Sequence, residues 1–364
     1  MIIGVLKEPT PETRVSLLPE HIAILKQWNV EVFVENNAGV TAFANNEKYI
    51  DAGAAIKSRN EVLENSDIIL SINALSVSDT GYKVSIILLG VYQPLFNVDL
   101  MKDLATKGLT VFSMDMLPRT TRAQSMDILS SQANIAGYKA VLTAANLFPK
   151  YFPMLMTAAG SVAPAKLLIL GAGVAGLQAI ATGKRLGAVV EVFDTRPAVK
   201  EEVMSLGAKF IEVDGAADAS KAGGYAVEQT EDFMQRQKAK IAESVAKADI
   251  IITTAQIPGK KAPILITIQM IEAMKNGSVV IDLAAATGGN TELTKNNETV
   301  IYKGVSIVGN SALASTMPSD ASKFYGKNIL NFLQLMISKE GVFNLNFEDD
   351  LVKGTCVVHN GVPM

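Results

Sequence analysis

The feature that most limits the possible folds of this chain is a glycine-rich turn between an apolar run and an amphipathic segment. The run Lys166–Leu170 is followed by Gly171-Ala-Gly-Val-Ala-Gly176, and the residues up to Leu186 carry apolar side chains at helical spacing. A second apolar run, Val189–Phe193, comes next and ends at Asp194. Strand, glycine turn, helix and strand in this order predict a β-α-β unit in a parallel sheet.

The rest of the chain repeats this alternation, which predicts an α/β fold of two Rossmann-like, doubly wound parallel-sheet domains joined by long helices. In the first third, we expect strands at Ile2–Leu6, Val30–Val34, Asp67–Ile72, Val84–Gly90 and Leu109–Met114, and helices at Pro19–Trp28 and Leu100–Lys107. In the second half, we expect strands at Lys166–Leu170, Val189–Phe193, Lys209–Glu212, Asp249–Thr254, Ser278–Leu283 and Ser306–Val308.

Two long helical patterns set the expected domain limits. One runs from about Thr121 to Phe148 and leads towards the second domain, and a chain of 364 residues suits about two domains. The other, about Asp320–Ile337, is expected to pack back across the domain junction and is followed by a short tail. We therefore predict a discontinuous first domain, residues 1–135 plus 320–364, and a second domain, residues 136–319.

Composition excludes several classes of protein. The formal net charge is −3, without a dense Lys/Arg stripe, so nothing predicts nucleic-acid binding. The single cysteine, Cys356, forms no internal disulfide, and no His/Asp/Glu cluster has the spacing of metal ligands. No apolar run approaches the roughly 18 to 20 residues of a membrane span, and the N-terminus reads as a first strand instead of a signal peptide. We expect a soluble chain with no membrane span and no metal.

The glycine turn has the residues of a dinucleotide site. Gly171 permits a tight turn, Gly173 lets the backbone approach a pyrophosphate, and Gly176 lets the helix pack against the strand. The N–H groups at the start of that helix attract phosphate. Asp194 lies 23 residues after Gly171 and can accept hydrogen bonds from both ribose hydroxyls. A glycine turn without a ligand is the alternative, but the complete pattern predicts a cofactor site.

Asp194 and Arg196 argue about which cofactor is bound. The Asp194 carboxylate repels a 2′-phosphate, which favours NAD(H). Arg196 keeps NADP(H) open as an alternative, because a guanidinium can pair with that phosphate. NAD(H) is the cofactor that we predict.

Residues for acid–base chemistry are scarce. The only histidines are His21, interpreted as a surface or half-buried side chain near the first helix start, and His359 in the C-terminal tail. A dehydrogenase that oxidises an alcohol or amine moves a proton as well as a hydride, most often through His or Lys. Hydride exchange between two nicotinamides releases no proton and needs no such group. The scarcity therefore favours this exchange, although a buried lysine remains an alternative base.

A second polar constellation precedes the long helical pattern. Arg119, Arg122, Gln124, Asp127 and Ser130 crowd one turn-and-helix region. Taken alone, these residues are typical of a capped helix with a solvated, charged face.

With this segment included, the chain resembles a known family. Residues 118–138, 171–179, 193–197, 222–225, 253–260 and 280–284 are similar, in order and spacing, to the NAD(H)-binding component of proton-translocating NAD(P) transhydrogenases. The resemblance covers essentially the whole chain.

The resemblance implies a role for each matching residue. Arg119, Gln124 and Asp127 would position the nicotinamide ring, Arg119 and Ser130 would hold its carboxamide, and Gln124 would reach towards the partner nucleotide. Tyr225 would lie on a mobile loop that closes over the nucleotide. The other implied cofactor contacts are Ala172, Val174, Ala175, Thr195, Arg196, Thr254 and Ala255, with Gly171, Gly173, Gly176 and Asp194.

The resemblance also implies an oxidoreductase and translocase activity that needs partner subunits. Hydride would pass directly between NAD(H) on this chain and NADP(H) on a partner subunit, and a membrane-spanning subunit would couple the exchange to proton translocation. The chain would then be a homodimer in the cytoplasm, held at the inner face of the bacterial inner membrane by its partners. A separate subunit and a fragment of a longer chain would have the same sequence.

Two other functions remain open. Alanine dehydrogenases share the opening pattern Lys7–Val15, so an NAD-dependent amino-acid dehydrogenase is the main alternative. Their catalytic lysine and histidine would fall near Ile72 and residues 89–93, where this chain has neither residue type. Without these partners, Arg14 is expected to form a structural ion pair. An NAD sensor without catalytic activity is the third possibility.

Overall fold

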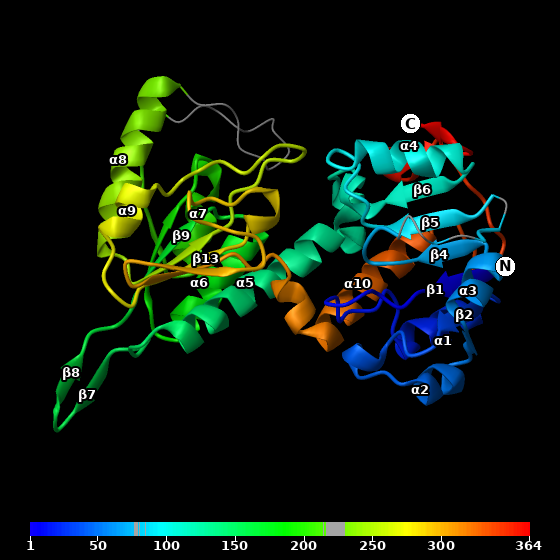
Figure 1. Ribbon diagram of the computed structural model, residues 1–364, viewed down its shortest axis with the longest axis horizontal. Coiled ribbons are helices and arrows are strands. Elements are labelled where there is room, and N and C mark those ends of the chain that lie inside the picture. The colour runs from blue at the N-terminus through cyan, green and yellow to red at the C-terminus, as the bar shows by residue number, and fades with distance from the viewer. Residues whose placement is uncertain (76–78, 80, 84, 214, 216–229) are drawn as a thin grey trace. The chain divides into compact units, whose positions relative to one another are not determined.

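The computed structural model describes residues 1–75, 79, 81–83, 85–213, 215 and 230–364 (Figure 1). These residues divide into two compact units, residues 1–132 with 314–364 and residues 133–313. Each unit has its own sheet of mainly parallel strands, which confirms the predicted α/β class with two Rossmann-like domains. We propose that the two units are the domains predicted from the sequence. The chain passes between them in helix α5 (Ile128–Leu147) and in the short helix η6 (Leu313–Thr316).

The first unit contains most of its elements before residue 127. Its strands are β1 (Ile2–Val5), β2 (Glu31–Glu35), β3 (Ala55–Lys57), β4 (Ile68–Leu70), β5 (Ile87–Gly90), β6 (Thr110–Ser113), β16 (Cys356–His359) and β17 (Val362–Pro363). Its helices are α1 (Pro19–Gln27), η1 (Val40–Ala42), α2 (Asn46–Asp51), α3 (Arg59–Asn65), α4 (Val98–Thr106), η2 (Met114–Met116), η3 (Thr121–Met126), α10 (Pro318–Leu333) and α11 (Asp350–Thr355).

The first sheet has the strand order β17-β16-β6-β5-β4-β1-β2-β3. The strands from β6 to β3 pair in parallel, with β1 and β4 as neighbours where the order reverses. The expectation of a plain C-terminal tail is wrong, because β16 joins β6 in antiparallel pairing. Buried side chains on both faces explain this extension: Phe112 of β6 and Cys356 share one core, while Val111 and Val358 share the other.

The second unit has strands β7 (Leu155–Thr157), β8 (Gly160–Val162), β9 (Lys166–Leu170), β10 (Val189–Phe193), β11 (Lys209–Phe210), β12 (Ile250–Thr253), β13 (Val279–Asp282), β14 (Thr299–Tyr302) and β15 (Val305–Val308). Its other helices are α6 (Val174–Arg185), η4 (Pro197–Val199), α7 (Lys200–Ser205), α8 (Glu231–Lys247), α9 (Ile268–Glu272) and η5 (Ala285–Thr287).

The second sheet has the order β11-β10-β9-β12-β13-β15-β14, and among its described strands only the pair β14–β15 is antiparallel. Successive side chains of β9 alternate between two cores: Leu167 and Ile169 face one, Leu168 and Leu170 the other. Burial on both faces is the usual state of a parallel sheet covered by helices. Strands β9 and β12 adjoin where the order reverses, and ligands of such folds bind at the carboxyl ends of these strands.

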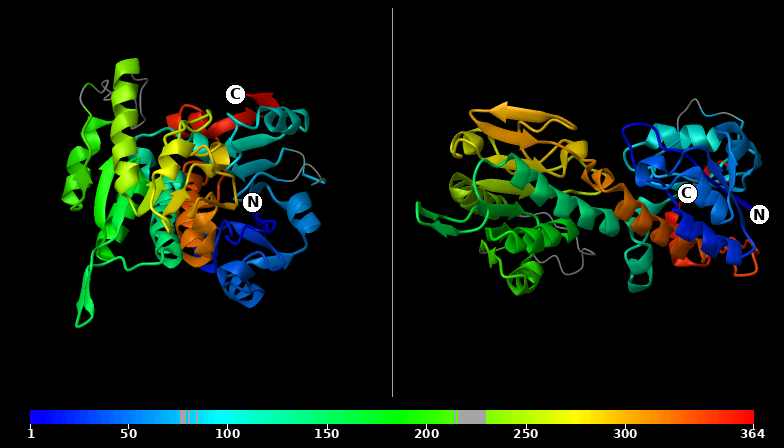
Figure 2. Two further views of the ribbon diagram at one scale, coloured as in Figure 1. Left: turned by 60° about the vertical axis from the view of Figure 1, so that its left-hand side comes forward. Right: turned by 90° about the horizontal axis from the view of Figure 1, so that it is seen from below.

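Strands β7 and β8 form a separate two-stranded hairpin outside this sheet. Figure 1 and Figure 2 both show the hairpin extending away from the rest of the second unit. Met154, Met156 and Val162 on it have exposed side chains. These two strands were not among those predicted from the sequence.

The helix expected to start at about Thr121 begins later. Residues 121–126 form the 3-10 helix η3, and Asp127 is extended, with φ −76° and ψ 93°. The Asp127 carboxylate accepts a hydrogen bond from the Ser130 N–H at 2.9 Å, which is how an N-cap residue starts a helix. The predicted start was therefore wrong, because local side-chain capping outweighs apolar periodicity here.

Candidate functional site

The glycine turn adopts the geometry that its three glycines predict. Gly171 has φ +107°, which disfavours any residue with a side chain, and it donates its N–H to the Phe193 carbonyl at 2.8 Å. A Cβ on Gly176 would lie 2.0 Å from the Gly171 carbonyl oxygen. Helix α6 therefore packs on the turn more closely than an alanine would allow.

Gly173 differs from the other two glycines of the turn. Its φ of −78° suits any residue, and nothing among the described residues lies within 4 Å of a Cβ placed there. It is the N-cap of the 12-residue helix α6, where it offers no side chain to the first-turn N–H groups. The structure thus leaves open space beside a helix N-terminus, as the close approach of a phosphate group requires.

Asp194, at the end of β10, is tied to both sides of the turn. Its side chain is only 6% exposed and accepts the Ala172 N–H at 2.7 Å. It also accepts hydrogen bonds from the Arg196 backbone N–H at 2.8 Å and from the Arg196 guanidinium at 2.7 and 2.9 Å. Hydrogen bonding to Asp194 raises the pKa of Arg196, so this guanidinium is already paired with a carboxylate.

The loop after β12 meets the glycine turn. The Thr254 hydroxyl donates to the Gly171 carbonyl at 3.1 Å, and the Thr254 N–H donates to the Leu170 carbonyl at 2.9 Å. The structure therefore brings Thr254 and Ala255 close to Gly171, where the strand order reverses. Both residues are among the cofactor contacts that the family resemblance implies. Thr195, which follows Asp194, is partly buried.

Asn290 belongs to this region but was not predicted from the sequence. It is fully buried; its side chain donates to the Ala255 and Pro263 carbonyls at 2.9 and 2.8 Å and accepts the Ala255 N–H at 3.1 Å. Its own N–H donates to the buried Asp282 carboxylate at 2.6 Å. Asn290 thus fixes the loop that follows Thr254. Its position after Gly288-Gly289 was the one sequence signal of a tight turn here.

In the first unit, the polar segment (residues 119–130) contains the other predicted residues. Asp127 and Ser130 lie together: the Ser130 hydroxyl donates to Asp127 at 2.6 Å, in addition to the capping bond from its N–H. Arg119 and Gln124 are exposed. Arg122 has a structural contact, since its guanidinium bonds both oxygens of Asp349 at 2.6 and 2.7 Å. Tyr225 and the loop around it lie outside the described residues.

The carboxyl edge of the first sheet is filled by the chain itself. The Glu8 carboxyl group, beyond the end of β1, accepts the Ile72 N–H at 2.5 Å and the Asn73 N–H at 3.2 Å beyond the end of β4. Glu8 is 8% exposed, and burial raises its pKa despite these hydrogen bonds. Backbone donors at the reversal of strand order therefore bind an internal group.

Arg14 and His21 also make contacts within the first unit. The Arg14 guanidinium pairs with both Glu12 oxygens at 2.7 and 2.8 Å, which confirms the expected ion pair. The interpretation of His21 as a surface or half-buried side chain is wrong. His21 is 4% exposed, its Nδ1 accepts the Leu18 N–H at 2.9 Å, and burial lowers its pKa. It closes the first turn of α1, a role that residue spacing alone did not reveal.

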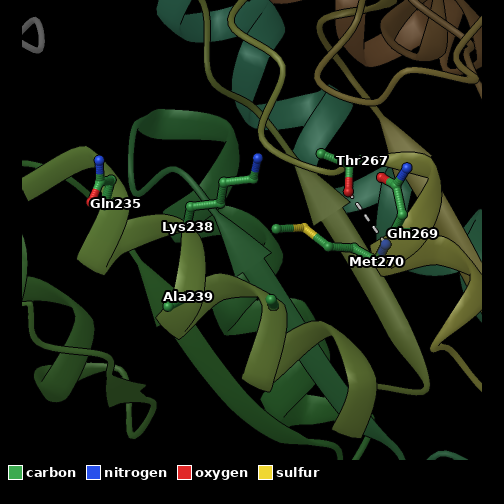
Figure 3. A pocket seen from close by; sticks show the side chains of 7 residues that line it. Gln235, Lys238, Ala239, Thr267, Gln269 and Met270 are labelled. Atoms are coloured by element: carbon green, nitrogen blue, oxygen red, sulfur yellow. Dashed lines mark hydrogen bonds between the residues drawn. The ribbon is translucent and has the colours of Figure 1, made fainter. Parts of the chain in front are cut away.

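Two surface recesses lie apart from the predicted residues. One, of about 460 Å³, lies between α8 and α9 and is lined by side chains that include Lys238, Thr267 and Met270 (Figure 3). The other, of about 530 Å³, is lined by residues that include Tyr151 and Arg185. Neither contains a predicted site residue. Among the described residues there is no cluster suited to a metal ion and no helix that is both long and apolar enough to cross a membrane.

Comparison with known proteins gives consistent matches across both units. The family described as "Alanine dehydrogenase/PNT, N-terminal domain" matches residues 4–136, and "Alanine dehydrogenase/PNT, C-terminal domain" matches residues 140–363. The NAD(P) transhydrogenase subunit alpha of Haemophilus influenzae is 43% identical over 99% of this chain and 71% of that protein. The crystal structure of transhydrogenase from Sinorhizobium meliloti has a TM-score of 0.91 and 42% identity, with 100% of each chain covered. An alanine dehydrogenase of Staphylococcus saprophyticus is 27% identical over 81% of this chain and 75% of that protein.

Proposed function

This chain belongs to the alanine dehydrogenase/PNT family and, within it, to the NAD(P) transhydrogenase alpha subunits, and on that premise we propose that it exchanges hydride between NAD(H) bound here and NADP(H) on a partner subunit. Its family membership makes this chain an oxidoreductase subunit, and its two units have Rossmann-like folds. The observation that carries the proposal is the glycine turn with open space at Gly173, beside the N-terminus of α6.

The residues of the second unit fit a bound dinucleotide. The first-turn N–H groups of α6 would hold the pyrophosphate, and Gly173 leaves room for it. Asp194 would accept the adenosine ribose hydroxyls, in exchange for part of its present bonding to Arg196. Thr254 and Ala255 would line the carboxyl end of β12. Because Arg196 lies beside Asp194, the two charges together offer a 2′-phosphate little net positive charge, which supports NAD(H) over NADP(H).

The polar segment is proposed to orient the nicotinamide. Arg119 and Ser130 would hold the carboxamide, with Asp127 fixing the Ser130 hydroxyl through their 2.6 Å hydrogen bond. Gln124 would reach the partner's nucleotide. Bound NAD(H) supplies or accepts the hydride at its nicotinamide ring. The contribution of these residues is then proximity, orientation and exclusion of water.

The same structure gives little support to amino-acid oxidation. The two places where the alanine dehydrogenase lysine and histidine would fall contain neither residue type, and Ile72 is 2% exposed and Leu89 is fully buried. Glu8, which bonds the backbone of Ile72, fills the neighbouring edge. Hydride exchange between nicotinamides needs no general base at these places.

The direct test mixes the pure chain with an NADP(H)-loaded partner domain and an oxidised NAD analogue. Hydride transfer from NADPH to the analogue, followed by absorbance, is the expected result, and its absence would contradict the proposal. Reduction of NAD⁺ by alanine with this chain alone would support the alanine dehydrogenase alternative instead.

Variants of the polar segment test the assigned roles. Arg119→Ala and Gln124→Ala are expected to slow hydride transfer about tenfold or more, because orientation is lost, while the Kd for NADH changes little. Gln27→Ala is a matched control, because Gln27 is also exposed but ends helix α1. Equal losses of rate and of binding would contradict a role in orientation.

We further propose that a membrane-spanning partner subunit couples the exchange to proton translocation and holds this chain at the inner face of the bacterial inner membrane. Support comes from the similarity to proteins named as transhydrogenase alpha subunits, since a subunit works with others. Co-purification of this chain with membranes that contain the partner, and its release when the partner is removed, would test this association.

We propose a homodimer in which a second copy covers the β7–β8 hairpin. A lone two-stranded hairpin is marginally stable in water, and this one exposes Met154 and Met156 at 64% and 78%. Contact with a second copy would remove these side chains from water. Sedimentation should give a dimer for the intact chain and a monomer for the variant Met154→Asp/Met156→Asp. A dimer of unchanged stability in that variant would contradict the hairpin as the interface.

A further inference from the structure

Two asparagine side chains of helix α10 form hydrogen bonds with the backbone of the polar segment. The Asn328 and Asn331 amides, three residues apart on one face of α10, both donate to the Ser125 carbonyl oxygen at 2.8 Å. A carbonyl oxygen has two lone pairs, so it accepts both bonds. The backbone is thereby fixed immediately after Gln124 and two residues before Asp127.

Asn328 also links this carbonyl to the start of α5. Its Oδ1 accepts the Ser131 hydroxyl at 2.7 Å, next to Ser130 in the first turn. Asn328 is 8% exposed, so these bonds are largely shielded from water. One amide therefore connects the η3 backbone, which carries Gln124, with the helix turn that carries Ser130 and its partner Asp127.

Apolar packing fixes only part of η3 in the polar segment. Ala123 and Met126 point into the core of the first unit and share it with Ile329 and Phe332 of α10. Gln124 and Ser125 between them are exposed. Packing thus anchors Ala123 and Met126, and the two amides hold the backbone at Ser125 between them.

We propose that Asn328 and Asn331 are positioning residues for hydride transfer, which act through the Ser125 carbonyl on Gln124, Asp127 and Ser130. This inference rests on the proposed function of the polar segment. A displacement of about 1 Å at a reacting group can cost about a hundredfold in rate. The two hydrogen bonds that fix the Ser125 backbone are therefore expected to affect the rate of hydride transfer.

The variants separate donor loss from general loosening. Asn331 is partly exposed, and within the described part of the chain its amide donates to Ser125 alone, so Asn331→Ala removes one donor at little cost in packing. Asn331→Asp has nearly the same size but can only accept at neutral pH. Asn328→Asp keeps the acceptor for Ser131 and loses the donor to Ser125. Asn65→Ala is the matched control, because Asn65 makes the same kind of bond at 2.8 Å to a helix carbonyl on α3.

Three measurements are made on the full chain: the Kd for NADH, the single-turnover rate of hydride transfer with the partner domain, and amide hydrogen exchange of residues 121–127. We expect Asn331→Ala and Asn331→Asp to slow transfer about threefold to tenfold, and Asn328→Asp/Asn331→Ala about a hundredfold. The Kd should stay within about twofold. Exchange at residues 121–127 should rise in these variants and not in Asn65→Ala.

Wild-type rates in Asn331→Asp or in the double variant would overturn the inference. Equal losses of rate and of NADH binding would also overturn it, because they indicate a general structural role. If Gln124→Ala slows transfer while the asparagine variants do not, the proposed function stands and the positioning role fails. If the wild-type chain transfers no hydride with an active partner, both fail.

Discussion

Gly173→Ala separates cofactor binding from folding at a single position. The Cβ of the alanine would meet nothing among the described residues within 4 Å, and φ −78° with ψ −170° is extended backbone that alanine adopts freely. Alanine reduces the conformational freedom of the unfolded chain, which stabilises the folded state by about 0.4–1 kcal/mol. Alanine is also a poorer N-cap than glycine, which costs about 0.5–1 kcal/mol of stability. The free energy of unfolding should therefore change by less than about 0.5 kcal/mol.

The effect on NAD(H) binding should be much larger. The added methyl group would occupy the space through which the pyrophosphate approaches the N-terminus of α6. Loss of one charge-assisted hydrogen bond costs about 1.5–3 kcal/mol, which corresponds to an increase in Kd of about 10- to 150-fold. NADH fluorescence titration measures the Kd, and urea denaturation measures stability.

Gly176→Ala is the opposite control. Its Cβ would lie 2.0 Å from the Gly171 carbonyl, a backbone atom that can move only with the turn. We expect a loss of about 1–3 kcal/mol in the free energy of unfolding. A Gly173→Ala protein that binds NADH within twofold of the wild type would refute the pyrophosphate assignment. A Gly173→Ala protein as unstable as Gly176→Ala would refute the interpretation of the open space.

Four further predictions concern other residues. Asp194→Asn should shift the ratio of NADPH to NADH affinity at least about tenfold towards NADPH in paired titrations, because a like-charge repulsion is removed; an unchanged ratio would contradict this role. Burial lowers the pKa of His21 below its ordinary 6.5, so as pH falls below 6.5 the unfolded chain takes up a proton that folded His21 does not, and stability is lost. Urea denaturation at pH 7.5 and 5.5 should show a smaller loss for His21→Gln than for the wild type, and equal losses would oppose this explanation. Burial raises the pKa of Cys356 to about 11, so a thiol reagent at pH 8 should label it only on unfolding; rapid labelling of the native chain would contradict its burial. Asn290→Ala should lower the free energy of unfolding by about 2–4 kcal/mol, because it leaves buried backbone groups unpaired, and a loss below about 1 kcal/mol would show that the loop repairs itself.

The sequence predicted best what depends on continuous local pattern. The strands Lys166–Leu170 and Val189–Phe193 were predicted with the limits that β9 and β10 have, because both are apolar runs bounded by the glycine turn and Asp194. The three glycines of the turn were also given geometric roles that the structure supports. In such a unit, side-chain periodicity and backbone requirements point to the same fold.

Features that depend on distant partners were not predictable. Strand β16 is short, and it forms because the edge of β6 is free to pair and its side chains are buried on both faces of the sheet. No local sequence pattern indicates this pairing. His21 looked like a helix-surface residue, but its burial depends on α10, where a Cβ on Gly326 would lie 2.4 Å from the imidazole. Asn290 and Asn328 act through backbone groups far away in sequence. Their amide side chains carry no periodic signal.

The Glu8 carboxyl group makes the two units differ in which backbone N–H groups are already bonded within the chain. In the second unit, the first turn of α6 has no side-chain cap at Gly173, so its N–H groups are available to a ligand. In the first unit, the donors after β4 already bind a group tethered three residues beyond the end of β1. A free anion would have to compete with this tethered carboxyl, whose effective concentration is in about the millimolar range or above. One side chain of the right length can thus occupy the backbone donors at the edge of a sheet, with the architecture of the sheet left intact.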